Sequence, residues 1–129
     1  NAAGVDYVVI NKDGSAPINA LVHKTSAGAI NSLKIFHVTN LSRAIKKMQK
    51  RGVWVIGLDG NSKSTIYDVN LMDATAIVMG SEGKGIRRLI KETCDQIVTI
   101  PMSGSIESLN VSVATGIALF ESKRQREST

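Results

Sequence analysis

Two glycine-rich stretches contain the residues whose types and spacing could do chemistry. The first, VMGSEGKG (78–85), ends an apolar run and places one glutamate among glycines, and the second is IPMSGSIESLN (100–110). Glycine lets a backbone approach a ligand closely and adopt dihedral angles that other residues resist. Backbone groups of such loops could bind the edge of an adenine base, while Ile100, Met102 and Leu109 pack against its faces. The pattern therefore favours one cofactor pocket over two simple turns.

The glycine spacing does not match the common nucleotide-binding loops. A Walker loop requires Gly-Lys-Ser/Thr at its end, whereas Lys84 is followed by Gly85 and Ile86. A dinucleotide fingerprint requires Gly-x-Gly-x-x-Gly, whereas GSEGKG reads Gly-x-x-Gly-x-Gly. A nucleotide-binding doubly wound domain is therefore the weaker interpretation of this sequence.

Apolar runs alternate with amphipathic stretches along the whole chain. We expect strands over 5–10, 33–39, 53–58, 75–80 and 96–101, and helices from Pro17 to about Ala29 and over 40–52, 86–94 and 108–126. Short strands alternating with helices predict an α/β fold, with a parallel sheet covered by helices on both faces. Ligand sites in such sheets lie at the carboxyl ends of the strands, where both glycine stretches begin. We find no linker and expect one domain.

The amino-acid composition limits the kinds of partner that this protein could bind. The net charge of +5 and the pI near 9.6 allow a polyanionic partner such as RNA, although a solvated basic surface explains them equally well. Aromatic residues make up 4% of the chain, which argues against a stacking platform for single strands. No apolar run reaches the roughly 20 residues of a membrane span, so we expect no membrane partner. One cysteine, Cys94, and two isolated histidines, His23 and His37, give no disulfide and no metal site.

Several other side chains have two possible roles. Trp54 lies in an expected strand, and we predict that it is part of the core. Asp59 follows the same strand and could contact a ribose. A basic helix face is expected to be solvated, with RNA contact as the alternative: Lys46, Lys47, Lys50 and Arg51. For Arg87 and Arg88, contact with RNA phosphate and simple solvation are equally open. The segment SKRQRE (122–127) is expected to be a frayed helix end, with dimer or RNA contact as the alternative.

The two glycine stretches belong to a longer recognisable segment. IVMGSEGKGIRRLIKETCDQIVTIPMSGSIESLNVSVATGIALFE (77–121) resembles the second and third motifs of the SpoU-type, or TrmH-type, RNA 2′-O-ribose methyltransferases of the SPOUT superfamily. It looks closest to the branch that methylates a guanosine ribose in 23S ribosomal RNA. AAGVDYVVI (2–10) and KTSAGA (24–29) also resemble earlier family segments, which extends the likeness over nearly the whole chain. The resemblance implies a deep C-terminal trefoil knot, S-adenosylmethionine as cofactor, a structured RNA substrate, a homodimer and a cytoplasmic location.

The resemblance also assigns site residues. It implies that the cofactor contacts Gly80, Ile100 and Leu109. Gly57 and Met102 are weaker candidates for lining the same pocket. Three polar residues are implied in the active site, where they would orient the target ribose: Glu82, Ser108 and Asn110.

One family feature is not found among these 129 residues. The reaction removes the proton of a ribose 2′-hydroxyl as its oxygen attacks the sulfonium methyl group, and alignment supplies much of the rate. The family assigns activation of the hydroxyl to an arginine in a first motif just before AAGV. We therefore expect residues 1–129 to be a methyltransferase domain without its motif-one segment, impaired alone but active in a parent enzyme. An additional RNA-binding domain would also lie upstream.

Two alternatives remain open. A non-catalytic RNA-binding or dimerisation module could keep the knot and lose the chemistry, which would suit the missing arginine segment. A tRNA ribose methyltransferase would share the same motifs, because the choice of 23S ribosomal RNA rests on family likeness alone.

Overall fold

The computed structural model describes residues 3–11, 34–60, 62–80, 85–103 and 110–128. They belong to two compact units, Asn1–Ala44 and Ile45–Thr129. The helix expected from Pro17 to about Ala29 lies outside the described residues. All five expected strands are present, and every strand pair is parallel, as the sequence predicts.

The first unit contains a parallel pair of strands, β1 (Tyr7–Asn11) and β2 (Lys34–Val38). Their register pairs Val9 with Phe36 at the centre. The Tyr7 and Phe36 rings are 5.8 Å apart, and both side chains are exposed. Both strands contain the β-branched residues that favour extended backbone.

Helix α2 (Leu41–Lys50) has the caps that the sequence predicts. The side chain of Asn40 accepts hydrogen bonds from the Ser42 hydroxyl at 2.9 Å and from the Arg43 amide at 3.0 Å. Gly52 follows the helix with φ of +86°, the left-handed conformation in which glycine is favoured. These local interactions explain why the bounds of this helix could be read from the sequence.

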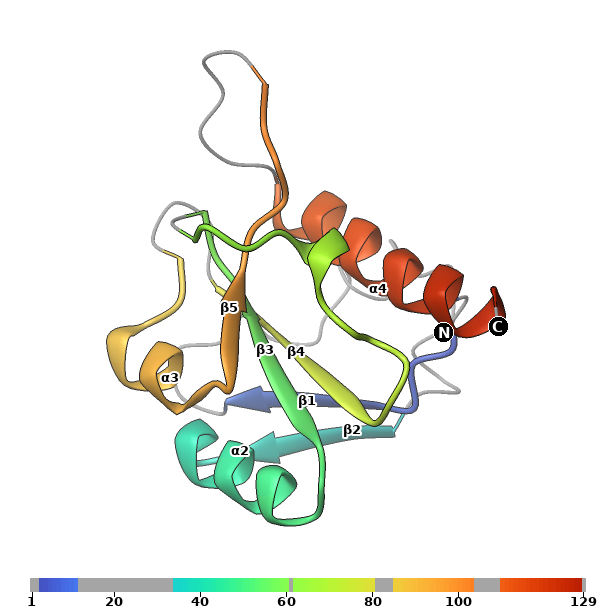
Figure 1. Cartoon of the computed structure of the whole chain (residues 1–129). Helices are drawn as coiled ribbons and strands as arrows, with labels where there is room; N and C mark the ends of the chain where they lie inside the picture. Colours follow the sequence, from blue (N-terminus) through green and yellow to red (C-terminus); the bar gives the residue numbers. More distant parts are fainter. Residues whose placement is uncertain (1–2, 12–33, 61, 81–84, 104–109, 129) are drawn as a thin grey trace. The chain divides into compact units, whose positions relative to one another are not determined.

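The second unit is built on a three-stranded sheet with strand order β4-β3-β5 (Figure 1). Strand β3 (Trp54–Leu58) is central, between β4 (Thr75–Met79) and β5 (Gln96–Val98). Its register places Leu58 opposite both Met79 and Val98. The last residues of the three strands therefore lie at one edge of the sheet.

Helices cover both faces of this sheet (Figure 1). On one face Ile56 and Leu58 pack in a buried cluster with Ala118 of α4 (Val111–Glu127). On the other face Gly57 lies against Ile86 and Cys94, which stand on either side of α3 (Arg88–Thr93) in the sequence. Successive strand residues point to opposite faces, which is why neighbours along β3 contact different helices. The predicted covering by helices on both faces is confirmed for this unit.

The segment between β3 and β4 contributes to the core, although the sequence pattern gave no element for it. A short 3₁₀ helix, η2, spans Ile66–Asp68. Ile66 and Leu71 are fully buried, and Val69 is 8% exposed. The apolar residues of this segment follow neither a helical nor a strand period, so no periodicity could indicate their burial.

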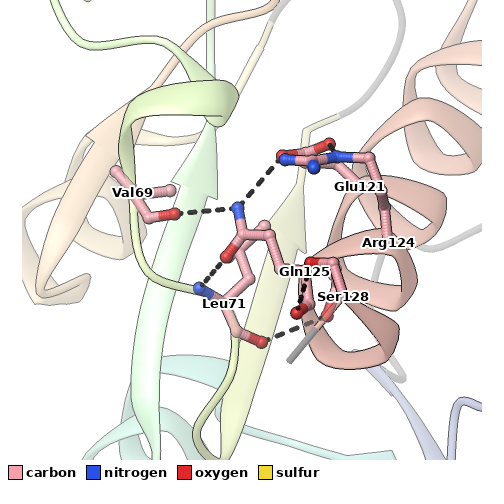
Figure 2. A network of polar contacts seen from close by, with 7 residues as sticks. Val69, Leu71, Glu121, Arg124, Gln125 and Ser128 are labelled. Carbon is pink, nitrogen blue, oxygen red and sulfur yellow. Dashed lines mark hydrogen bonds and ion pairs between the residues drawn. The ribbon is translucent and has the colours of Figure 1, made fainter.

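The C-terminal half of α4 is fixed to this segment by the α4 clamp, which we define as Ser122, Gln125 and Arg126. Figure 2 shows Gln125 of this clamp between Val69, Leu71 and Glu121. The Gln125 side chain donates to the Val69 carbonyl at 3.0 Å and accepts from the Leu71 amide at 2.8 Å. Its amide nitrogen also donates to Glu121 at 3.1 Å. The prediction of a frayed end was wrong, because these side chains bind backbone about 50 residues away in the sequence.

The Arg126 guanidinium completes the α4 clamp by donating to the Leu71 carbonyl at 3.0 Å and to the Asp73 carbonyl at 2.9 Å. The Ser122 hydroxyl donates to the same Leu71 carbonyl at 3.3 Å. All of these contacts are made to backbone atoms.

The prediction for Trp54 was also wrong. We predicted a core residue, but its side chain is 47% exposed. It is the first residue of β3, whereas the four residues that follow it are buried. Within the described residues, no helix has the length and apolar character needed to cross a membrane.

Candidate functional site

The carboxyl ends of β4, β3 and β5 bring two predicted cofactor positions to one edge of the sheet. Gly80 directly follows β4, and Ile100 lies two residues beyond β5. Between these strands, the backbone amide of Asp59 donates to the Val98 carbonyl at 2.9 Å. Gly80 and Ile100 therefore lie on the two strands that flank Asp59.

Gly80 has no room for a side chain. A Cβ atom there would lie 2.2 Å from the carbonyl carbon of Gly85 and 2.6 Å from the Ile86 nitrogen. We define the glutamate loop as Gly80–Ile86, and these distances show that its two ends touch. Gly85 has φ of +67°, which also favours glycine. Glu82 lies in the part of the loop outside the described residues, so its role stays a prediction.

The Asp59 carboxylate points to the second end of the glutamate loop. Its Oδ2 atom accepts from the Ile86 amide at 3.5 Å and lies 3.9 Å from the Lys91 ammonium. The Asp59 side chain is 10% exposed. Sequence reasoning placed this residue near a ribose and gave Lys91 no role, since the pairing joins residues from separate elements.

The residue that follows β5, Thr99, is held by the segment around Thr65. The Thr99 amide donates to the Ser64 carbonyl at 2.9 Å, and the Ile66 amide donates to the Thr99 carbonyl at 2.8 Å. Ile100 is 8% exposed and belongs to the buried cluster, whereas Met102 is 38% exposed. The chain thus changes from a fixed, buried backbone to exposed residues at the edge where a ligand would bind.

Asn110 is the N-cap of α4. Its side chain accepts from the Ser112 amide at 2.8 Å, as asparagine commonly does at this position. The helix therefore begins at Val111, three residues after the start that we predicted. Ser108 and Leu109 lie outside the described residues, so their proposed roles, like that of Asn110 toward the ribose, stay predictions.

Gly57 is tightly packed against Ile97 of β5 and against Ile86 and Cys94, which precede and follow α3. A Cβ atom there would lie 2.7 Å from Ile97, 3.0 Å from Ile86 and 3.2 Å from the Cys94 sulfur. Its role in lining a cofactor pocket stays a prediction. Burial, with a smaller contribution from the neighbouring Asp95 carboxylate, raises the pKa of the Cys94 thiol to about 11. The thiol is therefore protonated at neutral pH, in agreement with a structural role.

The basic side chains near the site are exposed. Arg87 and Arg88 lie at the start of α3, and Arg88 pairs with Glu92 at 2.9 Å. Such exposed pairs contribute about 0–1 kcal/mol to stability, so this pair does not determine the fold. Within the described part of the chain, no group of three or more histidine, cysteine, aspartate or glutamate side chains is placed to hold a metal ion.

The parallel sheet of the second unit places Gly80 and Ile100, one from each glycine motif, at its carboxyl edge, and comparison with known proteins identifies the class as an RNA methylase. Residues 1–120 match the model of the SpoU rRNA Methylase family. The chain belongs to this family.

Two similar curated proteins are named for the same activity. The chain is 55% identical over 125 residues to the 23S rRNA (guanosine-2′-O-)-methyltransferase RlmB of Xanthomonas campestris, covering 97% of the chain and 50% of that protein. It is 48% identical over 126 residues to RlmB of Escherichia coli, covering 98% of the chain and 52% of that protein. The chain therefore spans about half the length of these curated relatives.

Solved structures agree with the fold. The A. aeolicus TrmH/SpoU tRNA modifying enzyme has a TM-score of 0.87 at 33% identity, covering 98% of this chain and 64% of that one. The SpoU methyltransferase AviRb from Streptomyces viridochromogenes, in complex with AdoMet, has a TM-score of 0.89 at 25% identity, covering 99% of this chain and 53% of that one. The recognition made from the two glycine motifs is confirmed.

Proposed function

We propose that this protein transfers a methyl group from S-adenosylmethionine to the ribose 2′-hydroxyl of a guanosine in 23S ribosomal RNA. The observation that carries the proposal is the position of Gly80 and Ile100 at the same carboxyl edge of the sheet, in a chain of the SpoU family. The relatives at 55% and 48% identity have this activity in their names. Because the chain spans about half of those relatives, the activity of the whole protein is part of the proposal.

The residues at the sheet edge fit the proposed cofactor. An adenine needs apolar contacts on its faces and backbone groups at its edge. Buried Ile100 is followed by exposed Pro101, Met102 and Ser103, which offer both. When bound, S-adenosylmethionine supplies a methyl group on a positively charged sulfur. Support also comes from the AdoMet complex of AviRb, a structural relative. We assign further cofactor contacts to Gly80 and Leu109, with Gly57 as a lining residue.

On the RNA side, we assign the positioning of the target ribose to Glu82, Ser108 and Asn110. The hydroxyl must lose its proton during the transfer, and the family resemblance assigns this activation to an arginine of its first motif. The excess of basic residues, 16 against 11 acidic, would attract the phosphates of RNA. The exposed Arg87 and Arg88 follow the glutamate loop and would contact phosphate.

The finer architecture is also part of the proposal. We propose that residues 1–129 form the methyltransferase domain, with a C-terminal trefoil knot, in a cytoplasmic homodimer. Support for the knot comes from the resemblance and from the TM-scores to SpoU structures. Val113 and Phe120, 51% and 52% exposed, are seven residues apart and so share a face of α4 that a second subunit could cover. Phe120→Asp should then produce monomers in analytical ultracentrifugation.

The test is transfer of a labelled methyl group. The whole protein is incubated with radiolabelled S-adenosylmethionine and either a 23S ribosomal RNA transcript or a tRNA pool. We expect label in 23S RNA at the 2′-oxygen of one guanosine, and none when that nucleotide is 2′-deoxy. Label in tRNA alone would support the tRNA alternative. RNA binding without any transfer would support the non-catalytic module.

A further inference from the structure

We propose that Asp59 is a positioning residue that fixes the second end of the glutamate loop, through the Ile86 amide and the Lys91 ammonium. The proposal rests on the proposed function for its consequence, because that function assigns Glu82 within this loop to the target ribose. It differs from our expectation that Asp59 contacts a ribose of the cofactor.

Asp59 is itself firmly placed. It directly follows the central strand β3, and its amide donates to the Val98 carbonyl of β5 at 2.9 Å. Three of the four residues before it belong to the core, and each is at most 8% exposed: Val55, Ile56 and Leu58. A side chain on such a backbone is a rigid point from which a loop can be held.

The carboxylate is directed at the loop rather than at solvent. Its Oδ2 atom lies 3.5 Å from the Ile86 nitrogen and 3.1 Å from the position that a Cβ of Gly85 would take. The Asp59 side chain is only 10% exposed. The Oδ2 atom is thus turned toward the protein, as expected of an oxygen that holds the loop.

Lys91 gives the contact a second partner. Its ammonium lies 3.9 Å from the same Oδ2 atom, and its side chain is 36% exposed. The Lys91 amide also donates to the Arg87 carbonyl at 2.9 Å, and the lysine lies in the last turn of α3. Asp59 therefore joins β3, the end of the glutamate loop and the helix that follows it. Partly buried charges are less screened by salt than exposed ones.

The contact between Gly80 and Gly85 extends this effect to the first end of the loop. A Cβ on Gly80 would lie 2.4 Å from the Gly85 carbonyl oxygen, so the two backbones have no space between them. If Gly85 and Ile86 move, Gly80 is free to move as well. Holding Ile86 thus restricts both ends of the short segment that contains Glu82.

The first experiment measures loop anchoring without any activity. Amide hydrogen exchange of Ile86 is compared in the wild-type protein, Asp59→Ala and Asp59→Asn, with Asp73→Ala as the matched control. Asp73 is an exposed aspartate before β4, so Asp73→Ala removes the same single negative charge as Asp59→Ala. We expect roughly tenfold to a hundredfold faster exchange in Asp59→Ala, as loss of a hydrogen bond to a charged group predicts. Asparagine keeps an acceptor and should restore part of the protection.

The second experiment separates positioning from cofactor binding. We expect Asp59→Ala to lower kcat on 23S RNA about tenfold, with a cofactor Kd within about twofold of wild type. Lys91→Met should have a smaller effect, and should add nothing in the Asp59→Ala background.

Unchanged Ile86 exchange in Asp59→Ala would overturn the proposal. A large rise in cofactor Kd with unchanged exchange would instead make Asp59 a ribose ligand. If the wild-type protein does not methylate RNA, the proposed function fails, and the exchange data still decide the role of Asp59.

Discussion

Replacing Gly80 with alanine tests the close contact at the base of the glutamate loop. The new Cβ would lie 2.2, 2.4 and 2.6 Å from three backbone atoms of Gly85 and Ile86. Backbone cannot rotate away as a flexible side chain can, so the loop must open or the strand end must shift. Overpacking of this kind costs typically 1–3 kcal/mol. We expect a loss of about 2 kcal/mol in the free energy of unfolding.

The measurable consequences are a lower melting temperature and weaker cofactor binding. For a chain of this length, about 2 kcal/mol corresponds to a fall of about 7 °C in Tm. Isothermal titration with S-adenosylmethionine should show a Kd at least about tenfold higher, because the proposed function places Gly80 against the cofactor.

Gly116→Ala is the matched control. A Cβ at Gly116, within α4, meets no atom within 4 Å. The same substitution should therefore stabilise the protein by about 0.5–1 kcal/mol, because alanine is the better helix former. An unchanged Tm in Gly80→Ala would refute the packing argument. A lower Tm with unchanged cofactor affinity would show that the loop base is packed as described but that the cofactor binds elsewhere.

Three further predictions concern the rest of the fold. Gln125→Ala should cost about 1–3 kcal/mol in urea unfolding, because it leaves two backbone groups before β4 without their side-chain partner; a loss below about 0.5 kcal/mol would contradict the α4 clamp. The hydrogen-bonded Arg124 guanidinium holds the pKa of the Glu121 carboxyl below its ordinary value of 4.5. The stability that the ionised carboxylate contributes is therefore complete above pH 4.5, and it is lost as the pH falls through the lower pKa of the folded state. Stability of Glu121→Gln should accordingly depend less on pH below 4.5, and identical acid-unfolding curves would argue against this coupling. Trp54→Ala should cost less than half as much as Ile56→Ala, for which we expect about 2–5 kcal/mol, since the tryptophan is 47% exposed and the isoleucine fully buried; equal losses in thermal unfolding would restore Trp54 to the core.

Features encoded by nearby residues could be predicted from the sequence. Asn40 and Gly52 act on α2 through atoms within three residues or through their own backbone conformation. The strands follow from short β-branched runs, and the carboxyl-edge position of Gly80 and Ile100 follows from their parallel arrangement.

Features that depend on distant partners could not be predicted. The α4 clamp binds main-chain atoms of 69–73, and no sequence motif marks an acceptor that every residue possesses. Trp54 was assigned to the core by residue type, whereas its place at the start of β3 leaves it half exposed. The orientation of Asp59 depends on where the chain returns after the glutamate loop, which spacing alone does not give.

The α4 clamp has a consequence for how this family can diverge. Its hydrogen bonds end on main-chain atoms of Val69, Leu71 and Asp73, so the side chains of Asn70, Met72 and Asp73, all exposed, are not part of the interaction. Substitutions at Met72 and Asp73 should accumulate freely over evolutionary time, while Gln125 and Arg126 still bind the helix to this segment. Asn70 should vary less, because its side chain accepts from the Met72 amide at 2.8 Å. A saturation-mutagenesis survey should accordingly find that Met72 and Asp73 tolerate many substitutions, whereas Gln125 and Arg126 tolerate few.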